Sequence, residues 1–158
     1  MSDEKNTSES GFLITAMSPD ELAELLGSGS RMAVAQRGEE LLGYALMCPS
    51  NYLRALAPSF TPSSGEPLAL SRFDYLLQIA VQPESRRRGI ALELMSVIRP
   101  LATRGLVADV LLEPIENAAS LAFFGQAGFE RIGSFQFDAY PGIGPHRSAV
   151  FLWQTSAS

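Results

Sequence analysis

The chain has 158 residues, 46% hydrophobic and 18% charged, a balance typical of an ordinary globular domain. Its net charge of −5 argues against a nucleic-acid-binding protein, which would need a surplus of Lys and Arg, and slightly favours a cationic substrate such as an amine. No apolar run reaches the roughly 18 residues of a membrane span, no signal peptide is visible, and the single Cys48 fits a reducing compartment. We therefore expect a cytoplasmic protein without a membrane partner.

The first third of the chain predicts strands around one helix. Residues 1–10 are polar and aperiodic, so we expect a flexible tail there and a single domain over residues 11–158. Phe12 to Met17 predicts a strand. Ser18-Pro19-Asp20-Glu21 has the N-cap, proline and acidic residue that begin a helix, and Gly27 is a natural stop.

Two strands follow, Met32 to Gln36 and Leu41 to Met47, joined by a loop of hairpin length at Arg37-Gly38-Glu39-Glu40. They predict an antiparallel pair. From Cys48 to Arg72 the periodicity is lost among four prolines, and a connection this long is either a functional lid or a mobile segment, which leaves both interpretations open. A short amphipathic turn within it could be formed by Tyr52, Leu53, Leu56 and Phe60.

The central strand is predicted over Asp74 to Val81, where a buried-looking run stops before Pro83. Three arginines and Gly89 then open a helix over Ile90 to Arg104, which Pro100 should kink or shorten. The inner side of this helix is expected to carry Leu94, Val97, Ile98 and Leu101. A strand leading through a basic, glycine-containing turn into a helix N-terminus suits a phosphate, because unpaired N–H groups and the helix dipole meet there.

The last third predicts three strands and a helix. Leu106 to Leu112 is nearly all apolar and so favours an interior strand. Asn117 is a good N-cap for a helix through Gln126, with Gly128 just past its end. Arg131 to Asp138 and Arg147 to Gln154 predict the closing strands.

With these elements placed, the sequence resembles the GNAT superfamily of acyltransferases, which move an acetyl group from acetyl-CoA to an amine. Arg86-x-x-Gly89-x-Ala91 is similar to the family's pyrophosphate signature, Gln/Arg-x-x-Gly-x-Gly/Ala, and it follows a strand as in the family. Asn117-x-x-Ser120-x-x-Phe123-Phe124, with Gly128-Phe129 after it, is similar to the second cofactor segment. The element order β-α-β-β-β-α-β-α-β-β also matches. The resemblance implies an α/β fold with a mixed central sheet of about seven strands and three to four helices.

The resemblance also implies where acetyl-CoA binds. Pantetheine would bond to the backbone of the central strand, and the pyrophosphate would rest on the turn and first helical residues. The implied cofactor-binding residues are Ile79, Ala80, Val81, Arg86, Arg87, Arg88, Gly89, Ile90, Ala91, Leu92, Asn117, Ser120, Phe123 and Phe124.

Catalytic residues are less apparent, because Phe124 occupies the position where many family members carry a tyrosine that protonates the departing thiolate. Deprotonating a lysine-like amine at pH 7 requires about 4.6 kcal/mol and protonating a thiolate yields about 2 kcal/mol, so the base matters more. Family members often carry a Glu or His where this chain has Tyr75 or Leu77. We expect Glu113 and Tyr75 to be catalytic, while Asp74, Glu116 and His146 remain alternatives.

The function implied by the resemblance is transfer of an acetyl group to a primary amine of a small molecule or peptide by direct attack. No covalent enzyme intermediate, metal or nucleic-acid partner is expected, and a homodimer is compatible with the sequence. The alternative is a non-catalytic domain that binds acyl-CoA as a sensor or interaction module. The acyl chain length stays open, because cavity shape determines it.

Overall fold

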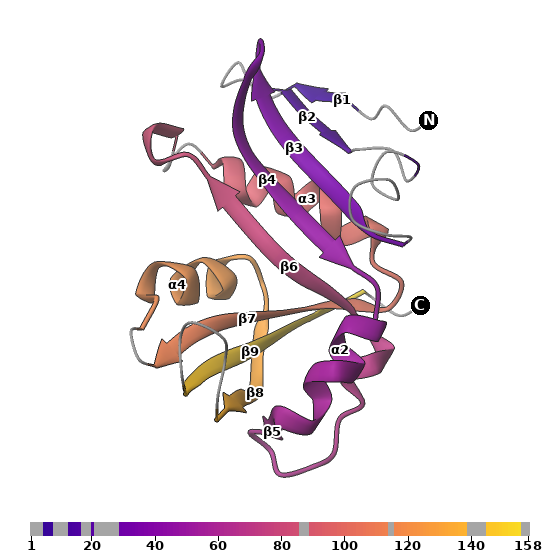
Figure 1. Cartoon of the computed structure of the whole chain (residues 1–158). Coiled ribbons are helices and arrows are strands. Elements are labelled where there is room, and N and C mark those ends of the chain that lie inside the picture. Colours follow the sequence, from indigo (N-terminus) through magenta and orange to yellow (C-terminus); the bar gives the residue numbers. More distant parts are fainter. Residues whose placement is uncertain are drawn as a thin grey trace. The chain divides into compact units, whose positions relative to one another are not determined.

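The computed structural model describes residues 5–7, 13–16, 20, 29–85, 89–113, 116–138 and 145–155. The chain divides into two compact units (Figure 1). Unit 1 contains Met1–Pro49 and Leu76–Thr103, and unit 2 contains Ser50–Tyr75 and Arg104–Ser158. Of the helix predicted to start near Ser18, only Asp20 is among the described residues, and it is helical.

The sheet of unit 1 has the order β1-β2-β3-β4-β6. The strands are β1 (Lys5–Thr7), β2 (Leu13–Ala16), β3 (Arg31–Arg37), β4 (Glu40–Cys48) and β6 (Asp74–Val81), of which Leu76–Val81 belongs to this unit. The pairings from β1 to β4 are antiparallel. Strand β1 differs from the sequence prediction, because three residues of the expected flexible tail pair with β2.

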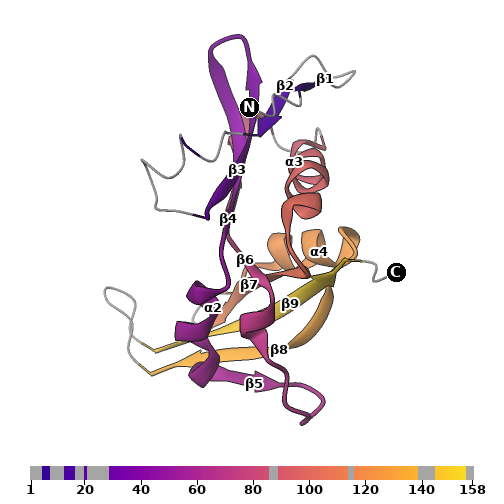
Figure 2. The same ribbon diagram turned by 90° about the vertical axis from the view of Figure 1, so that its right-hand side faces the viewer.

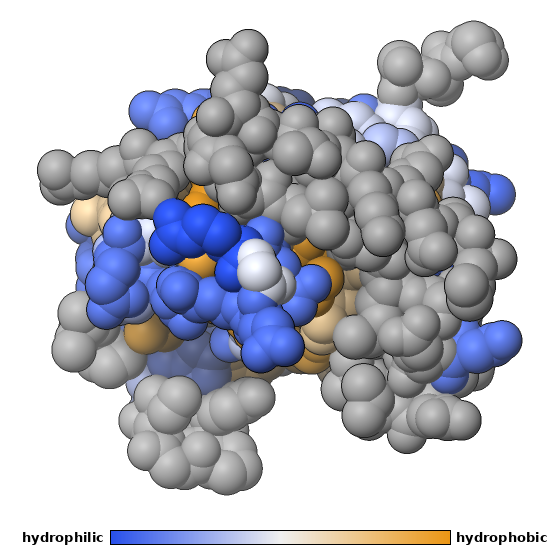
Figure 3. Space-filling view, turned by 90° about the horizontal axis from the view of Figure 1, so that it is seen from above, coloured by the Kyte–Doolittle hydropathy of each residue, from blue (hydrophilic) through white to orange (hydrophobic). Residues whose placement is uncertain are grey.

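The predicted hairpin between β3 and β4 is confirmed. Arg37 pairs with Glu40, so the connection is the two residues Gly38 and Glu39, and Gly38 supplies the positive φ of 61° that so tight a turn requires. Arg37 and Glu40 are exposed at the turn and lie 3.8 Å apart as an ion pair. Figure 3 views the molecule from above and shows mainly hydrophilic residues on the described surface, with some hydrophobic ones between them.

A bulge in the hairpin positions β4 against β6. Ala35 pairs with Gly43 and Gln36 with Leu41, so Leu42 is the extra residue on β4. The carbonyl of Leu42 accepts a hydrogen bond of 2.8 Å from the amide of Gln82, just past the end of β6. The bulge therefore ties the end of β6 to β4.

Helix α3 (Ile90–Ile98) lies beside the strands of unit 1 (Figure 1). Its buried residues Ile90, Leu94 and Ile98 repeat every four positions and form one apolar stripe. As predicted, Pro100 shortens the helix, since the chain continues as the 3₁₀ helix η4 (Arg99–Leu101). The inward orientation predicted for Leu101 is wrong, because its side chain is 38% exposed in this tighter turn.

The sheet of unit 2 has the order β6-β7-β9-β8-β5. The strands are β5 (Phe60–Pro62), β7 (Gly105–Glu113), β8 (Glu130–Phe137) and β9 (His146–Gln154). The first two residues of β6 also belong to this sheet. β6 pairs with β7 in parallel at Asp74 and Tyr75, and the remaining pairings are antiparallel. Figure 2 shows β5 beside β8 at the edge. The predicted mixed sheet is confirmed.

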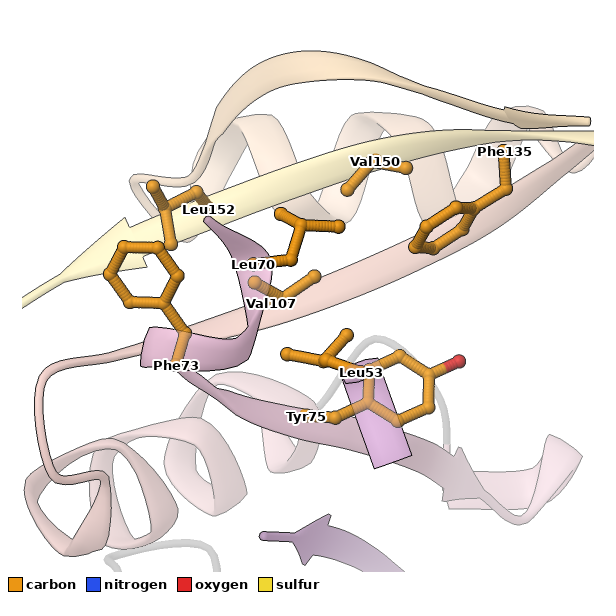
Figure 4. Packing of buried hydrophobic residues seen from close by; sticks show 8 residues of the cluster. All are labelled: Leu53, Leu70, Phe73, Tyr75, Val107, Phe135, Val150 and Leu152. Carbon is orange, nitrogen blue, oxygen red and sulfur yellow. The ribbon is translucent and has the colours of Figure 1, made fainter. Parts of the chain in front are cut away.

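The segment from Cys48 to Arg72 is folded rather than a long irregular loop. It contains α2 (Asn51–Leu56), the 3₁₀ helices η1 (Ala57–Ser59) and η2 (Leu70–Arg72), and β5. Leu53 and Leu70 are fully buried in the core of unit 2, so this segment supplies core residues (Figure 4). The other members of that core are Phe73, Tyr75, Val107, Phe135, Val150 and Leu152. The two sequence interpretations, a lid or a mobile segment, missed this packing role.

Helix α4 (Ala118–Gln126) covers the opposite face of the unit 2 sheet. Phe124 stacks on Phe151 of β9 with ring centroids 5.6 Å apart, whereas the neighbouring Val150 and Leu152 belong to the core under α2. Side chains alternate along a strand, so the two helices lie on opposite faces, as Figure 1 shows. The predicted N-cap is confirmed, since the amide of Ser120 donates to Asn117 Oδ1 at 3.1 Å.

These units form a mixed α/β fold. The described residues contain nine strands, two more than the expected seven if the three-residue strands β1 and β5 are counted. No helix in the described part of the chain is long and apolar enough to cross a membrane.

Candidate active site

The proposed phosphate turn lies in unit 1. Strand β6 ends at Val81, the 3₁₀ helix η3 (Pro83–Ser85) follows, and Gly89 is the N-cap of α3. Gly89 has a φ of 75°, a conformation that favours glycine, and a Cβ built there meets nothing within 4 Å in the described structure. The glycine of the first motif is thus explained by backbone conformation.

The start of α3 offers backbone donors to an anion. The amide of Glu93 donates to the carbonyl of Gly89 at 3.0 Å and closes the first helical turn. The amides of Ile90, Ala91 and Leu92 precede it and have no partner within an α-helix. Ile90 is buried, Ala91 half-buried and Leu92 exposed. Arg86, Arg87 and Arg88 lie outside the described residues.

The strand residues expected to contact pantetheine, Ile79, Ala80 and Val81, are half-buried in unit 1. Their position is set by β4. A Cβ at Gly43 would lie 2.7 Å from the carbonyl oxygen of Ala80, so only glycine lets the strands approach this closely.

The second cofactor motif lies in unit 2, at the start of α4. Asn117 caps the helix through the amide of Ser120, so this asparagine has a structural role. Phe123 is half-buried, whereas Phe124 is buried against Phe123, Phe129 and Phe151. The Phe124 ring is a core group of unit 2.

Glu113, one of the two expected catalytic residues, lies at the exposed end of β7. Its side chain is 63% exposed, and its Oε1 accepts a hydrogen bond from Arg147 Nη2 at 3.1 Å. Of the alternatives, Glu116 is exposed and Asp74 is half-buried. Because Glu113 forms an exposed ion pair with Arg147, a structural role at the surface is favoured over proton transfer.

Tyr75, the other expected catalytic residue, has a different environment. Its ring packs beside Leu53 in the core of unit 2 (Figure 4), and its hydroxyl donates a hydrogen bond to Asp109 Oδ1 on β7. Asp109 also accepts a hydrogen bond from the Ser148 hydroxyl, and it lies close enough to His146 for electrostatic interaction. We call these four residues, Tyr75, Asp109, Ser148 and His146, the Asp109 cluster.

Asp109 was missed by the sequence prediction, which treated Leu106 to Leu112 as an apolar strand. The signal was visible, because Asp109 is the only charged residue in that run. What the sequence does not show is that Tyr75, 34 residues earlier, meets it across the sheet. His146 is buried and stacks on Phe137 with ring centroids 4.7 Å apart.

Burial raises the pKa of the Asp109 carboxyl above its ordinary value of 3.8, because a carboxylate loses hydration in the interior. Hydrogen bonds from Tyr75 and Ser148 and the nearby His146 lower the pKa in part. A carboxyl group whose pKa is moved toward neutrality is suited to exchange protons.

Cys48 lies in unit 1 and is buried, with the Ser30 hydroxyl 3.9 Å from its sulfur. Burial raises the pKa of this thiol, which keeps it protonated and unreactive. The described residues contain no group of three or more His, Cys, Asp or Glu side chains arranged to hold a metal ion.

Comparison with known proteins identifies the class to which this fold and these motifs belong. The model of the acetyltransferase (GNAT) family matches residues 3–129, and the chain belongs to this family. The resemblance seen in the two motifs is therefore confirmed, and family membership makes the chain an acyltransferase. No curated protein matches the sequence significantly.

Solved structures agree on the fold. Arabidopsis thaliana NAA60 in complex with acetyl-CoA superposes with a TM-score of 0.62 at 16% identity, covering 92% of this chain and 99% of that one. The ribosomal-protein-S18-alanine N-acetyltransferase of Escherichia coli gives 0.57 at 17% identity over 90% and 79% of the two chains. The IAA acetyltransferase of Bacillus cereus gives 0.58 at 14% identity over 91% and 99%. At such identities the similarity establishes the fold alone.

Proposed function

We propose that this protein transfers an acetyl group from acetyl-CoA to a primary amine by direct attack of the amine on the thioester. The observation that carries the proposal is the strand, turn and helix from β6 to α3, in which Gly89 adopts a positive φ at the N-cap of a nine-residue helix. Family membership and the acetyl-CoA complex of NAA60 support acetyl-CoA as the co-substrate.

We assign the cofactor as follows. The backbone of Ile79 and Val81 would bond to pantetheine, and the amides of the first turn of α3 would bind the pyrophosphate together with Arg86, Arg87 and Arg88. The motif at the start of α4 would contribute a further contact through Ser120 and Phe123. Asn117 and Phe124 would support that motif, since the former caps α4 and the latter is buried.

Of the two expected catalytic residues, we favour Tyr75 over Glu113 as part of the site where proton transfer takes place. Its hydroxyl already shares a hydrogen bond with a carboxyl group, whereas Glu113 is paired with Arg147 at the surface. The buried, protonated Cys48 thiol supports a direct transfer without an acyl-cysteine intermediate. Family membership supports an amine acceptor, and the net charge of −5 favours a cationic one.

The cofactor assignment is tested by isothermal titration of acetyl-CoA into wild type, Gly89→Ala and a matched control, Gly65→Ala. Both glycines have nearly the same positive φ, 75° and 77°, with nothing within 4 Å of a built Cβ, so alanine adds the same backbone strain of about 1 kcal/mol at either site. Gly65 lies in unit 2, outside both motifs. We expect Gly89→Ala to weaken binding at least tenfold and Gly65→Ala to leave it unchanged.

Absence of acetyl-CoA binding to folded wild-type protein would refute the proposal. The transfer itself is measured by thiol release from acetyl-CoA with spermidine, tyramine, kanamycin, free amino acids and a peptide with a free N-terminal alanine. Turnover with any of them excludes the non-catalytic sensor. Binding of acetyl-CoA without turnover across this panel would favour the sensor.

A further inference from the structure

Asp109 is an unusual residue for its place in the fold. It lies in the middle of β7, with Ala108 and Val110 buried on either side of it in the chain. Removing a carboxylate from water is costly unless it is paired or hydrogen-bonded, and a buried ion is weak evidence for stability. Among the residues that the structure describes, no lysine or arginine forms an ion pair with Asp109. A valine there would suit the strand better, so the carboxyl group calls for a functional explanation.

The partners of Asp109 leave room for a cation. Tyr75 and Ser148 each donate one hydrogen bond to it, from β6 and β9, and its own backbone amide donates a third. An ionised carboxyl group has about four lone-pair sites, so about one remains. The side chain is half-buried rather than enclosed. The two hydroxyl groups are neutral and favour the ionised form of the carboxyl group, whose charge can attract an ammonium group.

We propose that Asp109 binds the protonated amine of the acceptor and accepts one of its protons, while Tyr75 and Ser148 hold the carboxyl group in position. This proposal rests on the proposed function, and it names the general base that the acetyl transfer requires. Transfer of one ammonium proton to Asp109 frees the nitrogen lone pair, which forms the C–N bond. The C–S bond breaks with its electron pair on sulfur. Of the two protons that nitrogen loses in all, one neutralises the thiolate and the other goes to solvent.

The surroundings of Asp109 indicate the rest of the acceptor. Register places Leu111, Phe135 and Ser148 on the same face of the sheet, since Leu111 pairs with Ser148 and Ser148 with Phe135. Next to them, Phe137 stacks on His146. Leu111 and Phe137 are half-buried and hydrophobic. We therefore infer an acceptor in which the primary amine is carried by an apolar or aromatic body.

The test compares two probes that differ only in the terminal group, the ammonium of phenethylamine and the hydroxyl of 2-phenylethanol, titrated into wild type and Asp109→Asn at pH 7. We expect wild type to bind the amine at least tenfold more tightly than the alcohol, and Asp109→Asn to lose that difference. Glu130→Gln removes a charge at an exposed position of β8 and is the matched control, expected to behave as wild type. The acetyl-CoA affinity of each variant is measured in parallel.

Two results would overturn the proposal: wild type that does not prefer the amine, or Asp109→Asn that keeps the preference. Unchanged acetyl-CoA binding in either case would leave the proposed function standing, so the two failures are distinguishable. Should Asp109→Asn not fold, the side-chain carboxyl carbon of Asp109 is followed by NMR in ¹³C-aspartate-labelled wild type. Phenethylamine must then shift this resonance and 2-phenylethanol must not.

The positioning role of Tyr75 and Ser148 is separated from a purely structural role by a pH profile. Loss of a hydrogen bond to the ionised carboxyl group raises its pKa. We expect Tyr75→Phe and Ser148→Ala to move the titration of the Asp109 carboxyl carbon to higher pH than in wild type. An unchanged titration in both variants contradicts the assignment.

Discussion

At the scale of the residue, the Asp109 carboxyl group lowers the stability of the folded state but is suited to proton transfer. The carboxyl group is half-buried in an otherwise apolar strand, and its hydrogen bonds from Tyr75 and Ser148 offset only part of the lost hydration, since burial is the larger effect on its pKa. Such a group makes the folded state less stable when it is ionised. Functional groups are often retained at a cost in stability of this kind.

The destabilising effect of the ionised Asp109 carboxyl group can be tested through the pH dependence of the free energy of unfolding. Because the folded pKa of Asp109 lies above its ordinary value of 3.8, the folded state holds the proton more tightly than the unfolded chain. The free energy of unfolding therefore falls as the pH rises from about 4 through the folded pKa. Asp109→Asn cannot ionise and lacks this fall. His146 and Tyr75 face the same group and are present in both proteins.

The measurement is urea unfolding of wild type and Asp109→Asn at a series of pH values from 4 to 8. We expect the free energy of unfolding of the variant, relative to wild type, to increase with pH over the lower part of this range. A relative stability that is flat with pH, or that decreases, would show that burial does not dominate at Asp109.

At the scale of the element, the pairing of β4 with β6 determines where the end of β6 lies. The bulge at Leu42 and the missing side chain of Gly43 let β4 approach Ala80 and Val81 closely. The same end of β6 carries Ile79 and Val81, to which we assign the pantetheine arm. Close strand packing in unit 1 is thus coupled to the proposed cofactor strand.

We expect Gly43→Ala to destabilise the protein by about 1–3 kcal/mol, as overpacking does, and to weaken acetyl-CoA binding several-fold by displacing Ala80. The control is Gly125→Ala in α4, where a Cβ meets nothing within 4 Å and the gain in helix propensity should add about 0.5–1 kcal/mol. Chemical unfolding and calorimetric titration measure the two quantities. If a folded Gly43→Ala protein bound acetyl-CoA as tightly as wild type, the packing of β4 would have no effect on the cofactor site.

At the scale of the whole molecule, the two cofactor motifs fall in different units. Gly89 and the start of α3 belong to unit 1, and Asn117 and the start of α4 belong to unit 2. Acetyl-CoA that binds the folded chain and not the unfolded chain must stabilise it by mass action. This stabilisation does not depend on turnover, so it also tests a protein for which no acceptor is known.

At a hundred times its dissociation constant, acetyl-CoA should add about 2.7 kcal/mol to the free energy of unfolding. For a chain of this size each kcal/mol corresponds to about 2–4 °C, so Tm should rise by about 5–10 °C. Differential scanning fluorimetry with acetyl-CoA measures the shift, and adenosine serves as the control because it lacks the phosphate and pantetheine groups. An equal shift with adenosine would contradict binding through the turn at Gly89.

Local sequence determined most of the elements. The tight turn at Gly38, the cap at Asn117 and the break at Pro100 each depend on a few neighbouring residues, and all three were predictable. The two motifs were predictable for the same reason, since their residues lie close together in the chain. Their spacing identified the family that the comparison confirms.

Tertiary structure alone decided which distant residues meet. Leu53 and Leu70 come from a stretch without periodicity, yet they enter the core of unit 2, because burial depends on what covers a side chain in space. Asp109 and Tyr75 are brought together by strand register, which two short sequence patterns do not reveal. The cofactor motif is therefore readable from the sequence, whereas the proposed proton acceptor becomes visible only once the strands are paired.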